Sequence, residues 1–242
     1  MTELDLFESL LTSESIEGLH AAVVSIVKQM GYEHFIYGVQ VNTSITRPYQ
    51  FVFSGYPKEW RGRYVEAGYQ NIDPTVVHCI KNKRVIPVIW DSQLFHNRPA
   101  ARLMGEAKEF GLASGVSFSV HGRYGESAML SLASSTHPRQ AKKDIAEYLG
   151  RGQLLACYLH EAVQRLVLSK EALPLQKIGL TEREKECLLW ASEGKTGGEI
   201  AEILNVSERT VIFHFQNISQ KMGVSTRQHA IARAISMGLV SI

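Results

Sequence analysis

The chain has 242 residues, of which 45% are hydrophobic and 21% are charged, with a formal net charge of +2 at pH 7. This length is comfortable for two domains, and the hydrophobic content is ample for packed cores. No apolar run approaches the roughly 18 residues that a helix needs to span a bilayer. The N-terminus MTELDLFESLL is acidic where a secretory signal is basic, and three widely spaced cysteines form neither a disulfide framework nor a metal motif. We therefore expect a cytoplasmic protein that does not act at a membrane.

The first part of the chain predicts helices and antiparallel strands. Residues 32–41 alternate between apolar and polar side chains, which indicates a strand, and residues 50–55 are its expected hairpin partner. Residues 115–122 and 127–134 predict a second hairpin, joined across the segment RYGE. The first predicted helix ends at Gly31 and has its apolar positions at Leu19, Val23, Ile26, Val27 and Met30. The expected fold is an α+β domain with an antiparallel sheet between helices, an α-β-α sandwich.

A long amphipathic helix is expected from about residue 142 to residue 168. Its leucine and aromatic side chains suit either a dimer interface or packing on the domain's own sheet, and both remain open. A proline interrupts the periodicity after it. We place the first domain at 1–168, a linker at 169–179 and a second domain at 180–242.

The second domain predicts a small all-α helix-turn-helix. Thr181 with Glu184, and Thr196 with Glu199, fit the capping box, in which a hydroxyl and a carboxylate each satisfy a free N–H at a helix start. The apolar positions Ile200, Ile203 and Leu204, and then Val211, Phe215, Ile218 and Met222, are expected to point inward. Charge is divided within the domain: residues 181–202 hold three basic and six acidic side chains, and residues 205–242 hold four basic and one acidic. Helical hairpins also occur in proteins that never bind DNA, but this positive half coincides with the second helix of the motif.

The stretch from Leu180 to Leu239 resembles the LuxR-type DNA-binding domain over its whole length, including Glu184, Leu188 and Gly194. This resemblance implies binding to double-stranded promoter DNA. Ile212 departs from it, because relatives often carry a polar or basic residue there, and it either packs against a thymine methyl group or a sugar or meets another helix. The implied DNA-binding residues are Lys195, Thr196, Ser207, Arg209, Thr210, Ile212, Phe213, His214, Asn217 and Lys221.

In the first domain, the segment 55–74 leads from several amphipathic aromatic side chains to one carboxylate before a proline. Tyr56, Trp60 and Tyr64 are four residues apart, so on a helix they would share one face. Buried tyrosines and tryptophans are usually core residues, and Asp73 before Pro74 is often only a turn. However, a carboxylate buried beside aromatic rings costs several kcal/mol unless a donor partners it. The combination therefore favours a polar binding site.

The segment YPKEWRGRYVEAGYQNIDPTV, with Trp90 and Gly115, resembles the acyl-homoserine-lactone-binding domain of quorum-sensing LuxR-type regulators, near the LasR branch. By this resemblance, Asp73 accepts from the amide N–H of the ligand and Trp60 donates to its lactone carbonyl. Tyr56 donates to the amide carbonyl, and Ser131 adds a donor to that carbonyl or serves a 3-oxo group through water. The implied pocket walls are Tyr64, Trp90, Thr75, Val76, Ile36, Gly38 and Ala107.

Two other functional classes remain open for the first domain. The adjacent His78 and Cys79 suggest a thiol hydrolase acting on lactones, but neighbouring side chains diverge on a strand or a helix. The domain could also sense a different small molecule or none. The histidines lack a paired metal motif, and neither a metal nor a cofactor beyond the lactone is implied. The expected protein is a quorum-sensing transcriptional regulator and no enzyme; it binds lactone, forms a homodimer and recognises a pseudo-palindromic promoter, with RNA polymerase as a further candidate partner.

Overall fold

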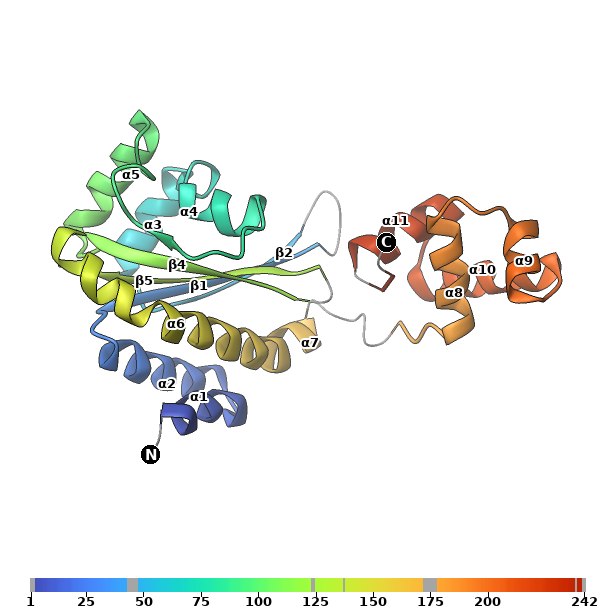
Figure 1. Cartoon of the computed structure of the whole chain (residues 1–242), viewed down its shortest axis with the longest axis horizontal. Coiled ribbons are helices and arrows are strands. Elements are labelled where there is room, and N and C mark those ends of the chain that lie inside the picture. The colour runs from blue at the N-terminus through green and yellow to red at the C-terminus, as the bar shows by residue number, and fades with distance from the viewer. Residues whose placement is uncertain are drawn as a thin grey trace. The chain divides into compact units, whose positions relative to one another are not determined.

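The computed structural model describes residues 3–42, 48–122, 125–136, 138–171, 178–237 and 239–240, without the side chains of 3, 138–145 and 171. The chain divides into two compact units (Figure 1), with the main division after Leu168. The turn segment at 123–124 and the predicted linker residues 172–177 lie outside the described residues. Ser169–Glu171 (α7), which the sequence assigned to the linker, is helical.

A five-stranded sheet forms the centre of the N-terminal unit, with the strand order β2-β1-β5-β4-β3. The β1/β5 and β4/β5 pairs are antiparallel, and Ser131 of β5 lies opposite Ile36 of β1 and Ser117 of β4. The predicted hairpin partners β4 and β5 are paired, and β2 lies beside β1 as expected. The strands are β1 His34–Val41, β2 Tyr49–Ser54, β3 Val88–Ile89, β4 Ser114–His121 and β5 Ser127–Ser134.

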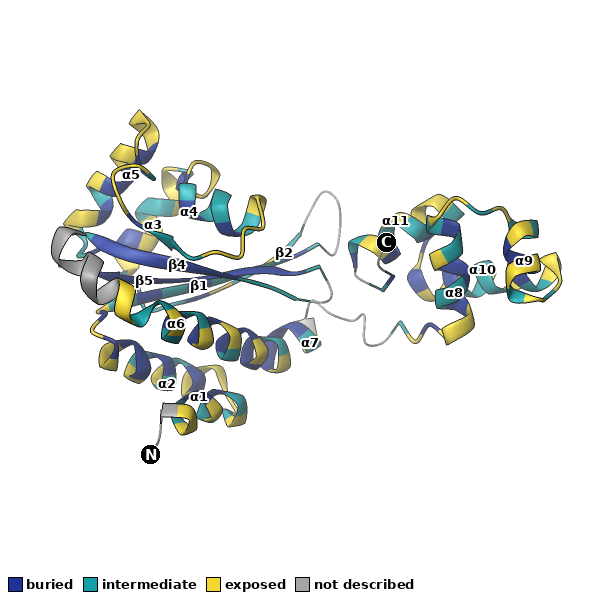
Figure 2. Ribbon diagram, viewed as in Figure 1, coloured by how far each residue is buried: buried dark blue, intermediate teal, exposed yellow. Residues whose placement is uncertain are grey.

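Helices cover both faces of this sheet (Figure 1), which confirms the expected α-β-α arrangement. One layer holds α1 Glu3–Thr12, α2 Ile16–Gln29 and α6 Pro138–Val163. The other holds α3 Lys58–Glu66, the 3-10 turn η1 Tyr69–Asn71, α4 Pro74–Val76, the π-helical turn η2 Val77–Lys81 and α5 Arg98–Glu109. Figure 2 shows the buried face of the strands between the two layers.

Strand β1 shows how the sequence pattern divides these layers. Its odd-numbered residues from Phe35 to Val41 are buried, while Ile36, Gly38 and Gln40 on the other face are half-buried. Successive side chains of a strand point to opposite faces. The second set therefore faces the layer formed by α3, α4 and α5.

The helices of the first layer start and end where local signals place them, with two differences from the sequence prediction. Ser15 caps α2, and Gly31 follows its end at a φ of 79°, which suits glycine. Helix α1 was not predicted, and α6 begins at Pro138 instead of near residue 142. The π-helical turn η3 Gln164–Leu168 continues α6. Helix α6 packs on β4 and α1 through a buried stripe that includes Leu155, Leu159 and Val163, so its apolar face serves its own domain.

The C-terminal unit is helical, with α8 Glu182–Ser192, α9 Gly197–Leu204, α10 Glu208–Met222 and α11 Arg227–Ser236. Both predicted capping boxes are closed, and Ser207 caps α10. Asn205, at a φ of 53°, ends α9 and opens the turn of the helix-turn-helix. Ile200, Val211, Ile218 and Met222 are buried as expected. The prediction for Ile203 was wrong: its side chain is exposed, because Ala201 occupies the inward position instead.

Candidate functional site

A cavity of about 570 Å³ lies between the sheet and the layer formed by α3, α4 and α5. Strands β1 and β5 supply its floor, and the segment from Tyr56 to Ile80 and helix α5 supply its walls. The structure brings all eleven predicted pocket residues to this cavity: Ile36, Gly38, Tyr56, Trp60, Tyr64, Asp73, Thr75, Val76, Trp90, Ala107 and Ser131. At Gly38, a Cβ atom would meet no atom within 4 Å, so the missing side chain adds to the space.

Asp73 is buried and caps α4. Its Oδ1 accepts hydrogen bonds from the Thr75 backbone N–H at 2.8 Å and from the Thr75 hydroxyl at 2.7 Å, and its Oδ2 accepts one from the Tyr64 hydroxyl at 2.9 Å. Burial raises the pKa of Asp73, although the hydrogen bonds from Thr75 and Tyr64 oppose this rise. The backbone N–H of Val76 also opposes the rise of this pKa. The Asp73 carboxylate is therefore partnered within the protein before any ligand binds. Within the described residues, Oδ2 is hydrogen-bonded to Tyr64, and a carboxylate oxygen can accept two hydrogen bonds, so Oδ2 can take one more.

Tyr56 reaches the cavity from the segment before α3, which begins at Lys58. The expectation that Tyr56, Trp60 and Tyr64 share one helix is therefore wrong for Tyr56. Among the described residues, its buried hydroxyl has no hydrogen-bond partner. Burial, together with the charge of Asp73, raises the pKa of Tyr56 well above its ordinary value. The hydroxyl thus keeps its proton and remains an available donor.

Trp60 lies in a cluster of aromatic rings on α3. Its ring centroid is 5.9 Å from that of Tyr64, 6.1 Å from that of Tyr69 and 5.5 Å from that of Phe110. Rings at these separations restrict the side chain and fix the direction of the indole N–H. No acceptor for that N–H is present in the described part of the chain, and Trp60 lines the cavity. Trp60 therefore offers a second unused donor.

Ser131 belongs to a chain of polar contacts on the sheet. The Trp90 indole N–H donates to Ser117 Oγ at 2.9 Å, and Ser117 Oγ lies 2.8 Å from Ser131 Oγ. Gly115 makes room for this indole, because a Cβ atom there would come within 2.9 Å of the Trp90 ring and 2.5 Å of the Leu132 carbonyl oxygen. If Ser117 donates its own proton to Ser131, the Ser131 hydroxyl is free to donate into the cavity.

The sequence did not predict the polar cavity residues contributed by β1, β2, α3 and η1, or most of the cavity residues of α5. Gln40, Gln50, Arg61 and Gln70 add polar side chains to the cavity lining, and Gln50 Nε2 donates to Gln40 Oε1 at 3.2 Å. Gln40 could have been found, because it shares the strand face of Ile36 and Gly38. Helix α5 contributes Leu103 and Met104, which lie within one turn of the predicted Ala107 and so share its face.

An ion-pair cluster joins α3 to α5 beside the cavity. Arg63 donates two hydrogen bonds to Glu106, at 2.7 and 2.9 Å, and Arg102 donates a third at 2.9 Å. The hydrogen bonds from Arg63 and Arg102 hold the pKa of Glu106 down at about 2. Both helices line the cavity, so this cluster holds two of its walls together.

The geometry of His78 and Cys79 does not support a hydrolase. Cys79 is fully buried, and burial raises the pKa of its thiol to about 12. The His78 Nε2 lies 2.7 Å from the Ile86 carbonyl oxygen. A thiol with so high a pKa carries almost no thiolate at neutral pH and is not a nucleophile.

In the C-terminal unit, the predicted DNA-binding residues differ in exposure. Arg209, Ile212 and Phe213 on α10 are exposed, whereas His214 and Asn217 are half-buried. Ser207 and Thr210 bond to one another through their hydroxyl groups at 2.8 Å. Near the start of α9, Lys195 Nζ lies 3.7 Å from Glu199 Oε1, and Thr196 caps the helix.

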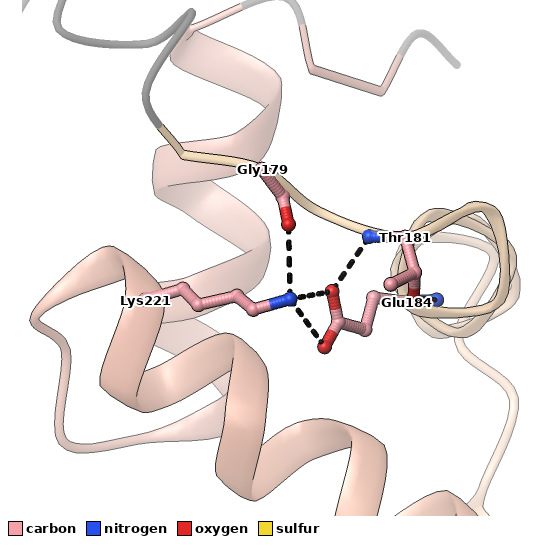
Figure 3. A network of polar contacts seen from close by, with 4 residues as sticks. All are labelled: Gly179, Thr181, Glu184 and Lys221. Carbon is pink, nitrogen blue, oxygen red and sulfur yellow. Dashed lines mark hydrogen bonds and ion pairs between the residues drawn. The ribbon is translucent and has the colours of Figure 1, made fainter.

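Lys221, which was predicted to contact phosphate, makes three hydrogen bonds within the chain. Its ammonium donates to both carboxylate oxygens of Glu184, at 2.9 and 2.7 Å, and to the Gly179 carbonyl oxygen at 2.9 Å (Figure 3). Glu184 Oε2 also accepts the Thr181 backbone N–H at 2.7 Å. The three donor sites of the ammonium are thus used within the domain. We therefore assign Lys221 to domain stability instead of phosphate binding.

A cavity with polar groups at one end of an α-β-α sandwich, together with a helix-turn-helix in the same chain, defines the class of small-molecule-sensing DNA-binding regulators. Family models agree with this class. Residues 15–163 match the autoinducer binding domain, and residues 179–234 match the bacterial regulatory proteins of the luxR family. The chain belongs to the LuxR family of quorum-sensing transcriptional regulators.

Relatives cover almost the whole chain. The transcriptional activator protein AnoR of Acinetobacter nosocomialis is 35% identical over 98% of this chain and 98% of its own. The quorum-sensing regulator RhlR of Pseudomonas aeruginosa is 30% identical over 93% of this chain and 90% of its own. Among solved structures, Escherichia coli SdiA superposes with a TM-score of 0.79 at 26% identity, covering 99% of this chain and 98% of its own. SdiA in complex with octanoyl-rac-glycerol gives a TM-score of 0.78 at 26% identity, with coverage of 98% and 94%.

These findings settle the class of activity. The relatives are transcriptional regulators, and the chain is an autoinducer-binding, DNA-binding regulator and not an enzyme. Among the described residues, no helix combines the length and the apolar character needed to cross a lipid bilayer.

Proposed function

We propose that the autoinducer of this protein is an N-acyl-L-homoserine lactone bound in the N-terminal cavity. The observation that carries this proposal is the set of unused hydrogen-bonding groups at the cavity wall. The buried Tyr56 hydroxyl and the cavity-lining Trp60 indole N–H make no hydrogen bond among the described residues, and Asp73 Oδ2, which accepts from Tyr64, can accept one more. A lactone of this class offers two carbonyl acceptors and one amide donor, which is the complementary set.

Each group takes the role that its chemistry allows. Trp60 has only a donor and pairs with the lactone carbonyl, and Tyr56 pairs with the amide carbonyl. Asp73 accepts the amide N–H beside its bond from Tyr64. Ser131 adds a donor from the sheet. The acyl chain then packs against the apolar side chains of the lining, such as Leu103 and Met104, and the cavity volume lies within the roughly 300–1,000 Å³ of small-molecule sites.

A second ligand class deserves a direct comparison because of the SdiA complex with octanoyl-rac-glycerol. An acylglycerol has an ester in place of the amide and offers hydroxyl donors instead of an amide N–H. Asp73 can accept from the amide N–H of a lactone or from a hydroxyl of an acylglycerol. The two free donors discriminate better, because an acylglycerol has one carbonyl group and a lactone ligand has two. We favour the lactone because two fixed donors, Tyr56 and Trp60, match its two carbonyl groups.

Binding of defined ligands to the purified full chain tests this proposal. Isothermal titration with a panel of N-acyl homoserine lactones, and with the matching monoacylglycerols, gives their relative affinities. The proposal predicts tighter binding of at least one lactone than of any acylglycerol with the same chain. Mass spectrometry of ligand bound to protein from cells supplied with the whole panel provides an independent ranking. Preference for the acylglycerols in both measurements would replace the lactone with a lipid.

We further propose that the ligand-bound protein is a cytoplasmic homodimer that binds a pseudo-palindromic promoter and engages RNA polymerase there as an activator. Two helix-turn-helix units on adjacent major-groove faces need such a site. In each unit, Lys195 and Thr196 at the start of α9 approach phosphate, as do Ser207 and Thr210 at the start of α10. The base-facing candidates are Arg209, Ile212, Phe213, His214 and Asn217. Sedimentation of the liganded protein with a selected duplex measures the two-to-one stoichiometry that the proposal expects.

A further inference from the structure

The recognition helix α10 carries a row of exposed side chains opposite its buried face. Val211, Ile218 and Met222 are buried against the other helices. Arg209, Phe213 and Gln216 follow at spacings of four and three residues, and all of them are exposed. Side chains three and four residues apart share one face of a helix. The outward face of α10 therefore presents an arginine, a phenylalanine and a glutamine in this order.

The apolar part of this face is large. Phe213 is 57% exposed and its neighbour Ile212 is 53% exposed. In the described part of the chain, the ring contact of Phe213 is with His214, at 6.1 Å between centroids. Single exposed apolar residues are common on protein surfaces and need no explanation. Here, however, two large ones lie on the exposed side of the helix that a helix-turn-helix inserts into the major groove, with their side chains about 100° apart around its axis.

The major groove offers an apolar group to such side chains, the C5 methyl group of thymine. The sugars and the C5–H edge of cytosine are also apolar, but among the base edges the thymine methyl group projects furthest into the groove. Arginine pairs with guanine O6 and N7, and glutamine pairs with adenine N6 and N7. The exposed row can therefore read a guanine and an adenine on either side of thymine methyl groups.

We propose that Phe213 and Ile212 are specificity-determining residues that read thymine methyl groups in each half-site, with Gln216 as an added adenine reader. This proposal rests on DNA binding by the helix-turn-helix. A protein partner for the same patch is the competing outcome. DNA is favoured because Arg209, one turn before Phe213, has no ion-pair partner in the described part of the chain. Its free guanidinium suits a groove lined by phosphates.

Replacing thymine with deoxyuridine tests the proposal, because this change removes only the methyl group and keeps base pairing. The full chain, produced with N-octanoyl-L-homoserine lactone, first selects its preferred duplex from a random pool. Fluorescence anisotropy then compares that duplex with versions carrying deoxyuridine at single positions. We expect about fourfold weaker binding for each methyl group that is contacted, the value of one buried CH₂ group.

The variants Phe213→Ala and Ile212→Ala should bind the thymine and deoxyuridine duplexes equally at the positions that each side chain contacts. Phe213→Leu keeps an apolar side chain and should retain part of the methyl sensitivity, so loss of folding is separable from loss of contact. The matched control is Ile235→Ala on α11, which replaces another exposed isoleucine, 38% exposed, and should keep the full sensitivity. For Gln216→Ala, preference for one adenine should fall while methyl sensitivity remains.

Three results would overturn the inference. Equal binding of every deoxyuridine duplex by the wild-type protein excludes methyl readout. Unchanged methyl sensitivity in both alanine variants assigns the readout to other residues. Variants with normal DNA binding but weaker reporter transcription assign the patch to a protein partner. Failure of the wild-type protein to select any duplex is a different result, since it contradicts DNA binding itself.

Discussion

The two domains differ in how one central buried polar group is satisfied. In the C-terminal domain, the buried Glu184 carboxylate is fully engaged by Lys221 and the Thr181 N–H, and both capping boxes are closed. In the N-terminal domain, the Tyr56 hydroxyl faces a cavity without an acceptor among the described residues. A buried polar group without a partner costs about 1–3 kcal/mol. The carboxylate at the centre of the C-terminal domain is therefore satisfied within the protein, whereas the Tyr56 hydroxyl can gain a partner from a bound ligand.

The largest expected effect is on ligand binding by Asp73→Asn. The amide can turn its NH₂ group toward the ligand N–H, which replaces an attraction with two opposed donors. We expect a loss of about 2–4 kcal/mol in binding free energy, measured by isothermal titration. The same amide also loses one of the bonds from Thr75 or Tyr64, so a smaller loss of apo stability should accompany it. The control is Tyr64→Phe, which removes one donor to Asp73 and keeps the carboxylate.

The pH dependence of binding separates these roles further. Burial raises the pKa of Asp73 in the free domain. The ligand N–H favours the ionised carboxylate, so binding lowers this pKa and affinity should fall as the pH drops through the raised value. In Asp73→Asn no carboxylate titrates there, and this part of the pH dependence should disappear. Equal pH profiles of the two proteins would contradict the contact.

A variant of Glu184 tests the corresponding claim for the C-terminal domain. Glu184→Ala leaves the Lys221 ammonium and the Thr181 N–H without their shared partner. The Lys221 side chain is 35% exposed, so water can solvate part of its charge. We therefore expect a loss of about 2 kcal/mol in the stability of the C-terminal domain, measured by denaturant unfolding. Ligand affinity should not change. Glu182→Ala removes the exposed partner of Lys185 and is the matched control, with an expected effect near zero.

Glu184 also gives a pH signature. Burial raises the pKa of Glu184, but the hydrogen bonds from Lys221 and Thr181 outweigh it and leave the pKa lowered. The stabilisation is therefore present above the pKa of the unfolded chain and is lost as the pH falls through the lowered value. Acid unfolding of the wild-type C-terminal domain should show this loss, and Glu184→Ala should not.

A smaller effect is expected for Trp60→Phe. This change keeps an aromatic ring in the cluster with Tyr69 and Phe110 and removes one N–H donor. Affinity for the lactone should fall about tenfold, the value of roughly 1–1.5 kcal/mol for one hydrogen bond. An analogue without the lactone carbonyl should bind both proteins equally. If the analogue still distinguishes them, Trp60 contacts another part of the ligand.

The smallest effect concerns phosphate contacts. Lys195→Ala should lower the slope of log affinity against log salt by about one unit, if its ammonium leaves Glu199 for a phosphate. Lys221→Ala should instead lower domain stability, because its ammonium is held by Glu184. A salt slope that changes in the Lys221 variant and not in the Lys195 variant would reverse these assignments.

The sequence predicted local secondary structure better than the bonds between side chains that are distant in the chain. Alternation in β1 and the capping boxes near Thr181 and Thr196 follow from local rules, so their placement agreed with the structure. The bonding of Asp73 depends on Tyr64, nine residues away, and the bonding of Lys221 depends on Glu184 in another helix. No periodicity reports such pairs. Some polar residues of the cavity were missed for the same reason, since Gln50 and Arg61 line one cavity only in the folded domain.

Hydrogen–deuterium exchange of the full chain, with and without N-octanoyl-L-homoserine lactone, shows whether the ligand stabilises the N-terminal domain and leaves the C-terminal domain unchanged. Ligand that binds only the native state stabilises it by about 4 kcal/mol at a thousandfold excess over Kd. We expect strong added protection of amides in β1, β5, α3 and α5, and unchanged exchange in α8 and α10. Confirmed binding without added protection in the sheet, or equal protection of both domains, would contradict this expectation.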